Sequence, residues 1–175
     1  MATRKSIWIL FGILIIAAWL FGYITQAGAQ TYTVKCRTTG HLPKVHVIEV
    51  GDVPGHILGV SELAGVQSCD DGSVATYSAK SFFDYIKGNG ESLSYSLATY
   101  EDGSTLWGKW QNTITSDPDG KTSSWEGTTE SIGGTGRFEG IQGSGSYTGK
   151  RLASAPGVGA QWYLDTILTY TLPSE

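Results

Sequence analysis

Glu49 is the side chain best placed to act as an acid or a base. It belongs to the β-branched run Val45–Val50, in phase with Val45 and Val47. Because alternate residues of a strand face the same side, we expect Glu49 to point with these valines into an apolar interior. A carboxyl group in such surroundings could exchange a proton with a bound molecule. The alternative is a position near a wet rim, where Glu49 has no special chemistry.

Other polar residues offer weaker chemistry. His41, His46 and His56 are the only histidines, and their spacing matches no usual ligand pattern, so no metal site is predicted. The run 117–120, Asp-Pro-Asp-Gly, lacks the further acidic ligands of a calcium loop and indicates a turn. No histidine follows His56, and the G-x-S-x-G elbow is absent, so a classical serine hydrolase is excluded.

Cys36 and Cys69 are the only cysteines. In an exported protein they could form a disulfide, which is the pairing we predict. The alternative is two separate buried thiols. No C-x-x-C motif is present, so neither a thioredoxin-like site nor a zinc knuckle is indicated.

Residues 1–29 have the pattern of an export signal. Arg4 and Lys5 precede the uncharged apolar run Ile7–Ile24, and Ala27-Gly28-Ala29 supplies an A-x-A cleavage site. Cleavage would leave one domain, residues 30–175, in the periplasm or outside the cell. The alternative is an uncleaved membrane anchor over residues 7–24, since about 20 apolar residues span a bilayer.

The composition is that of an antiparallel β-protein. Charged residues make up 16% of the chain, which also has 24 glycines, six tryptophans and nine tyrosines. Such a chain is neither disordered nor a coiled coil. Without Arg4 and Lys5, 10 of the 12 basic residues remain against 16 acidic ones, a net charge of −6. With no basic cluster, this charge excludes nucleic acid as a partner.

Alternation with period two and short turn signals recur along residues 45–172. About eight strands joined by tight hairpins favour an all-β fold, an eight-stranded antiparallel up-and-down barrel preceded by the N-terminal apolar helix. A β-sandwich is the alternative. The predicted strands are Val45–Val50, His56–Leu63, Val74–Ile86, Leu93–Leu97, Thr105–Thr115, Thr122–Ile132 and Gln161–Leu172, with one more in the glycine-rich segment Gly133–Gly149.

The lumen of an eight-stranded barrel is either filled by side chains or holds one small ligand. Phe83 and Tyr85 share one face of their strand, with Phe82 on the other face, and Trp110 has the phase of an inward residue. Together with Val47, these inward aromatic residues are the predicted ligand contacts. If Phe83, Tyr85 and Trp110 instead pack the lumen closed, a ligand there is disfavoured.

The glycine-rich segment Gly133–Gly149 is the most specific feature of the sequence. It is not a nucleotide fingerprint, because β-like residues rather than a helix follow the glycines. It indicates a barrel corner where backbones approach closely. Arg137–Ile141 could form one helical turn there, with Phe138 and Ile141 plugging the core.

This segment resembles the glycine-rich hairpin shared by allene oxide cyclases, dirigent proteins and related bacterial barrel proteins. Val45–Gly55 is similar to the first strand and turn of the cyclases, and the resemblance covers most of residues 31–173. The matching positions of the pattern G-G-[ST]-G-x-F-x-G-x-x-G are Gly133, Gly134, Thr135, Gly136, Phe138, Gly140 and Gly143.

The resemblance implies a calycin-like barrel with an apolar cavity, assembled as a dimer or trimer and needing no metal or organic cofactor. Glu49 matches the position of the cyclase carboxylate, but Gly51 stands where the cyclases have an asparagine. One fold can host unrelated functions, so three remain open. The first is binding of a small apolar ligand, a lipid or aromatic metabolite, in the lumen. The others are a cyclase or isomerase that uses Glu49, and an interaction module with a filled barrel.

Overall fold

The computed structural model describes residues 30–119, 121–153 and 156–173. The predicted export segment, residues 1–29, and the apolar helix expected within it lie outside this part of the chain. Within the described part, no helix has the length and hydrophobicity needed to cross a membrane.

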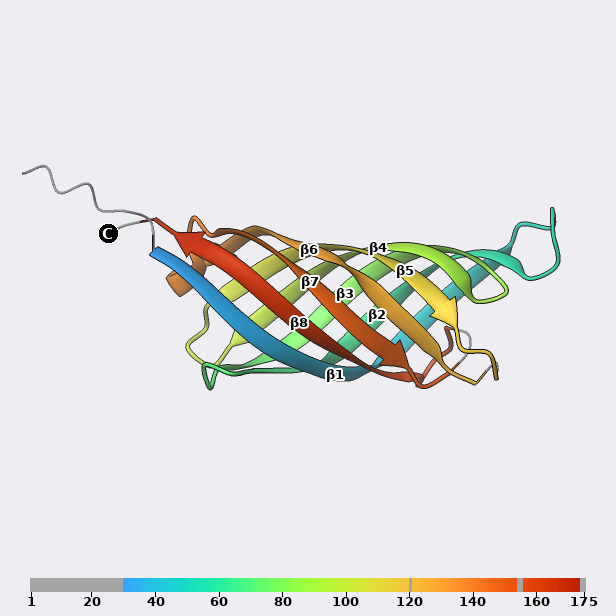
Figure 1. Cartoon of the computed structure of the whole chain (residues 1–175), viewed down its shortest axis with the longest axis horizontal. Helices are drawn as coiled ribbons and strands as arrows, with labels where there is room; N and C mark the ends of the chain where they lie inside the picture. Colours follow the sequence, from blue (N-terminus) through green and yellow to red (C-terminus); the bar gives the residue numbers. More distant parts are fainter. Residues whose placement is uncertain (1–29, 120, 154–155, 174–175) are drawn as a thin grey trace, which may run out of the picture.

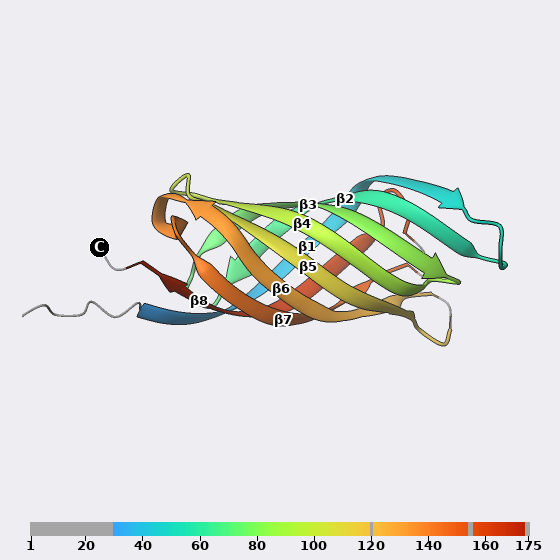
Figure 2. The same ribbon diagram turned by 90° about the horizontal axis from the view of Figure 1, so that it is seen from above.

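Eight antiparallel strands form a closed barrel in which every strand pairs with its neighbours in sequence and β8 pairs with β1 (Figures 1 and 2). The all-β up-and-down barrel is therefore confirmed, and the sandwich alternative is wrong. A 3-10 turn, η1 (Gly136–Phe138), precedes β7. The strands are β1 (Gln30–Glu49), β2 (His56–Cys69), β3 (Val74–Ile86), β4 (Asn89–Tyr100), β5 (Thr105–Ser116), β6 (Ser123–Thr135), β7 (Gln142–Arg151) and β8 (Gln161–Leu172).

The first two strands are longer than the sequence predicts. β1 begins at Gln30 rather than Val45, and β2 continues past Gly65 to Cys69. Gly65 pairs with Gly40 inside the sheet, and a Cβ added to Gly65 would lie 2.2 Å from the carbonyl oxygen of Thr39. This glycine therefore permits a close backbone approach within the strand instead of ending it.

A bulge divides β1 into two parts. The register with β2 shifts between His41 and Lys44, so the inward face changes from even-numbered to odd-numbered residues. Val45 then packs against the core. β8 pairs with β1 only as far as His41, so Lys44–Glu49 extends beyond the closed wall (Figure 1).

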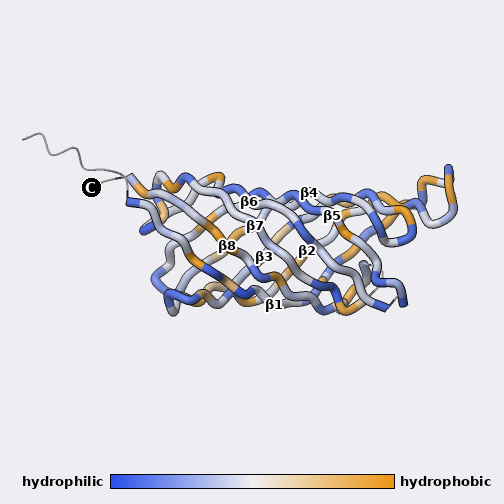
Figure 3. Tube along the Cα trace, in the orientation of Figure 1, coloured by the Kyte–Doolittle hydropathy of each residue, from blue (hydrophilic) through white to orange (hydrophobic). Residues whose placement is uncertain are grey.

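The interior is filled by two clusters of buried side chains, and apolar and polar residues alternate along the strands around them (Figure 3). The smaller cluster closes one end. There Phe138 and Ile141, beside η1, are each 5% exposed and pack with Tyr100, which confirms the predicted plug. The larger cluster consists of Leu42, Leu63, Tyr77, Ala79, Phe83, Tyr85, Trp110, Ile114, Trp125, Tyr147, Trp162 and Leu164.

The predicted disulfide between Cys36 and Cys69 is present. The two cysteines are directly opposite each other on β1 and β2, and Cys36 is buried. The bridge therefore ties the first strand to the second at the end of the barrel opposite the overhang.

Replacing Cys36 and Cys69 together by alanine is expected to lower the free energy of unfolding by about 3–4 kcal/mol, because the unfolded chain loses its cross-link. The bridge spans a sequence separation of 33 residues. Equilibrium urea denaturation measures the difference. A reductant should shift the wild-type curve similarly and leave the double variant unchanged. Equal stability of the two proteins under oxidising conditions would contradict this account.

Candidate functional site

The aromatic residues predicted to contact a ligand in the lumen pack against one another instead. Phe83 and Tyr85 are 5% and 3% exposed, and their rings stack with centroids 4.7 Å apart. Trp110 meets the ring of Tyr147 at 4.8 Å and donates from Nε1 to Ser96 Oγ at 2.7 Å. Gly59 makes room for this packing, since a Cβ there would lie 2.2 Å from the Phe83 ring.

The space left inside this part of the barrel is a void of about 30 Å³. It is large enough for one water molecule but not for a metabolite. Its polar lining includes Ser61, Ser81, Asn112 and Arg151. Arg151 is 1% exposed and donates from Nε to the carbonyl oxygen of Ala153 at 3.1 Å. Burial lowers the pKa of Arg151, and Tyr85 partly opposes this effect.

Glu49 and Val47 do not reach the interior. By parity they lie on the same side of β1 as Val45, as the sequence predicts, but the barrel wall has ended where they occur. Val47 is 45% exposed, and Glu49 is exposed at the last position of the strand. The expectation that Glu49 points into an apolar interior is therefore wrong, because β1 is longer than the strand that should enclose it.

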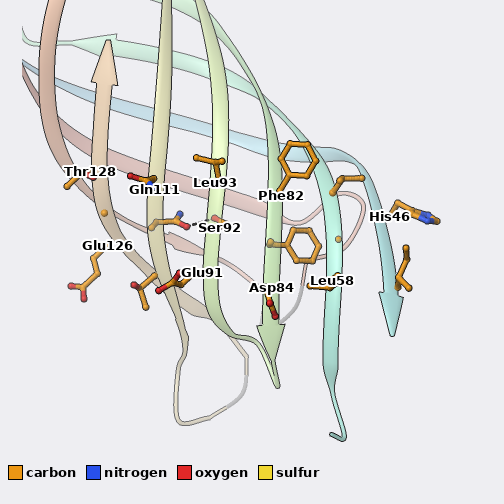
Figure 4. Close-up of a pocket in the computed structure, with 17 residues that line it drawn as sticks. His46, Leu58, Phe82, Asp84, Glu91, Ser92, Leu93, Gln111, Glu126 and Thr128 are labelled. Carbon is orange, nitrogen blue, oxygen red and sulfur yellow. Dashed lines mark hydrogen bonds between the residues drawn. The ribbon is translucent and has the colours of Figure 1, made fainter. Parts of the chain in front are cut away.

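An open groove of about 770 Å³ lies on the outer face of the barrel (Figure 4). Strand register arranges its outward-facing lining residues in two rows that cross strands β1 to β6, and between them lies a row of Gly59, Phe83, Ser92, Asn112 and Gly127. One row contains Ile48, Leu58, Asp84, Glu91, Thr113 and Glu126. The other outward-facing row contains His46, Val60, Phe82, Leu93, Gln111 and Thr128.

The polarity of strands β2 to β4 is inverted beside this groove. Ser61 and Ser81 are buried inside, whereas Val60 and Phe82 on the outside are 43% and 56% exposed. On β4, Ser92 and Ser94 line the interior void while Leu93 lines the groove. The large rings in the lumen leave room for only small side chains opposite them. The apolar side chains of these strands are consequently presented to the outside.

The other half of the groove is acidic. Asp84 and Glu91 are directly opposite each other on β3 and β4, an arrangement that like charges make unfavourable. Glu126 lies two strands further along the same row. A cation or hydrogen-bond donor in the groove would relieve the repulsion between these carboxylates.

His56, when protonated, supplies one positive charge at the end of this row. Its Nδ1 lies 2.6 Å from Asp52 Oδ1, and its Nε2 lies 2.9 Å from Asp84 Oδ1. Both ring nitrogens can donate only when the imidazole is protonated. The bonds to Asp52 and then Asp84 accordingly raise the pKa of His56, and the bond from His56 lowers the pKa of Asp52. Through these two ion pairs, His56 links Asp52 in the β1–β2 turn to Asp84 near the end of β3.

Of the residues predicted to form a site, only Phe83 lines the groove, because the alternation of the strands was taken to place the site inside the barrel. The signal was present, since Phe82 was assigned to the face opposite Phe83. Of the three histidines, only His56 is held by carboxylates, while His46 lines the groove. Among the described residues, no group of histidine, cysteine and acidic side chains could hold a metal ion.

Comparison with solved structures shows that this fold is the dirigent-type barrel. One pterocarpan synthase dirigent protein is 14% identical, with 83% of this chain and 90% of that chain aligned and a TM-score of 0.50. A second is 14% identical over 83% and 97%, with a TM-score of 0.47. A pyocyanin demethylase is 13% identical over 78% and 99%, with a TM-score of 0.45. No protein-family model and no curated protein matches the sequence.

These identities concern the fold alone. The resemblance that the glycine-rich segment carries to dirigent-type barrels is confirmed at that level. What the protein binds depends on this chain's own groove, void and strand ends.

The two ion pairs of His56 predict a pH-dependent contribution to stability. The contribution of His56 is complete below its ordinary pKa of 6.5 and is lost as the pH rises through the raised folded-state pKa. The contribution of Asp52 is complete above its ordinary pKa of 3.8 and is lost as the pH falls through the lowered one. The two ion pairs of His56 should therefore stabilise the protein most between pH 3.8 and 6.5.

Thermal unfolding of the wild type and the His56→Gln variant tests this. The gap between their midpoints should be widest near about pH 5 and should shrink well above neutrality. His46→Gln is the matched control, because His46 is exposed and forms no ion pair with the described residues. A gap that widens as the pH rises would show that the proposed charge state is wrong.

Proposed function

We propose that this protein binds a small apolar molecule in the outer groove rather than in the barrel lumen. The observation that carries the proposal is the contrast in space, about 770 Å³ outside against about 30 Å³ inside. Small-molecule sites commonly occupy about 300–1,000 Å³ and have mainly apolar walls. The interior void is below that range, while the groove lies within it.

The side chains that line the groove also suggest which chemical groups the ligand carries. Leu58, Val60, Phe82 and Leu93 offer an apolar surface, and the ring of Phe82 is the largest exposed element of it. The acidic side chains begin at the next positions of the same strands. A ligand with a flat apolar body and a cationic or hydrogen-bond-donating end would match both halves. In this proposal the ligand lies in the groove, and the packed rings of Phe83, Tyr85 and Trp110 support the wall of the barrel beneath it.

We also propose that the domain acts outside the cytoplasm. A disulfide between Cys36 and Cys69 is consistent with an oxidising environment. The export pattern of residues 1–29 supports the same location.

Phe82→Ala should weaken binding of the fluorescent apolar probe diphenylhexatriene by about tenfold, because a ring in the middle of the groove is lost. Fluorescence titration gives the dissociation constants. Tyr95→Ala is the matched control, since Tyr95 is 44% exposed on β4 but does not line the groove. Unchanged binding to Phe82→Ala, together with weaker binding to the lumen variant Trp110→Phe, would place the site inside and overturn the proposal.

A trimethylammonium derivative of the same probe should bind about two- to fivefold more tightly than the neutral probe at low salt, as expected for exposed charges. Replacing Glu91 and Glu126 by glutamine should abolish this preference without changing the affinity for the neutral probe. Added salt should have the same effect. If the double variant keeps the preference, the acidic row does not contact the ligand.

A further inference from the structure

The overhanging part of β1 has one unpaired edge. On one side, Lys44–Glu49 pairs with β2 along its whole length. On the other side, the pairing with β8 ends at His41, and the last backbone contacts are those of Leu42 with Gly159 and Ala160. Beyond Leu42, no described residue forms a hydrogen bond with this edge. The overhang extends past the rest of the barrel, so nothing in the described structure covers it (Figures 1 and 2).

The backbone groups on this edge can be assigned from the register. The N–H of Val50 donates to the carbonyl oxygen of His56 at 3.1 Å, so Val50 turns its peptide groups toward β2. Peptide groups in an antiparallel pair alternate in direction along the strand. Val45, Val47 and Glu49 therefore direct their N–H and C=O groups to the open side. These groups form a ready template for another extended strand.

The centre of the edge has none of the usual features that prevent pairing, which are confined to its start, where the bulge, Pro43 and Lys44 lie. Its centre, Val45 to Ile48, contains no charged side chain and no proline, and it is rich in β-branched residues. Val47 and Ile48 are 45% and 60% exposed. Pro43 and the Gly51 turn bound the segment, so it offers a short ladder of defined length rather than an unlimited one.

We propose that this edge pairs with the same edge of a second copy of the chain, in an antiparallel dimer whose two-fold axis passes through Val47. A two-fold axis normal to the joined sheets keeps inward faces with inward faces, so residues of equal parity must be opposite each other. Several registers meet this condition, and the one centred on Val47 pairs the whole segment: Val47 lies opposite Val47 and Val45 lies opposite Glu49.

The charges of the segment permit a copy of itself as the occupant. In this register Lys44 is opposite Val50 and Glu49 is opposite Val45 of the other copy, and Lys44 keeps its ion pair with Glu62 of its own chain. No like charges become direct neighbours. His46 and Ile48, which line the groove, become cross-strand partners on the outer face, so the grooves of the two copies meet at the joint.

Val47→Glu tests the dimer, because it places two carboxylates directly opposite each other at the axis and changes only an exposed side chain. Sedimentation equilibrium from micromolar to millimolar concentration should show dimers for the wild type and a dissociation constant at least about tenfold higher for the variant. Val66→Glu is the matched control, since Val66 is 48% exposed on β2, away from the edge, and should remain dimeric.

Amide hydrogen exchange gives an independent measurement that does not require a variant. The N–H groups of Val45, Val47 and Glu49 should become more protected as the protein concentration rises, while that of Val50, already bonded within the chain, should not change. A monomer at all concentrations would overturn the proposal, and so would a dimer that Val47→Glu leaves intact. Protection that appears only when an unrelated extended peptide is added would also overturn it, because a different partner would then occupy the edge.

Discussion

The ladder of hydrogen bonds between β1 and β8 is the constraint on which the rest of the structure depends. It closes the sheet, and it stops at His41 because β8 begins at Gln161. β1 has 20 residues and β8 has 12, so a closed barrel of these strands must leave part of β1 without a neighbour. The overhang, the exposure of Glu49 and the open edge follow from this difference in length. His56 fastens the turn that the overhang carries to the end of β3.

Closure also determines where a ligand can bind. Eight strands enclose a narrow lumen, and here the rings of Phe83, Tyr85, Trp110 and their neighbours occupy it. Burying these rings stabilises the barrel, since each fully buried large apolar side chain contributes roughly 1.5–3 kcal/mol. The same packing leaves no ligand-sized space inside. A barrel of this fold can thus gain its stability from the interior and present its chemistry on the outer face.

The sequence was sufficient to predict the barrel, most of its strands and the aromatic plug at Phe138, because each depends on local pattern or a short motif, whereas the first half of β1 was missed. The disulfide could be predicted because Cys36 and Cys69 are the only cysteines. Which face of each strand is buried was harder to predict. Serines alternate with Leu93, Tyr95 and Leu97 along β4, and the alternation alone does not say which set is buried. The rings of Phe83 on β3 and Trp110 on β5, directly opposite Ser92 and Ser94, decide this by admitting only small side chains. Glu49 was misplaced for a similar reason, since its surroundings depend on where β8 begins, more than 100 residues later.

On β2 to β4, the residues buried inside the barrel and the residues exposed outside it depend on each other. Ser61 and Ser81 line the interior void of about 30 Å³, so these inner positions have little room for larger side chains. Folding therefore draws little from the outer side chains of the same strands, and Phe82, at 56% exposed, is not required by the core. Apolar residues that the core does not need, gathered beside a row of carboxylates, are explained more economically by a bound partner than by stability. Under the proposed function, the outer face binds the ligand and the filled lumen supports that face.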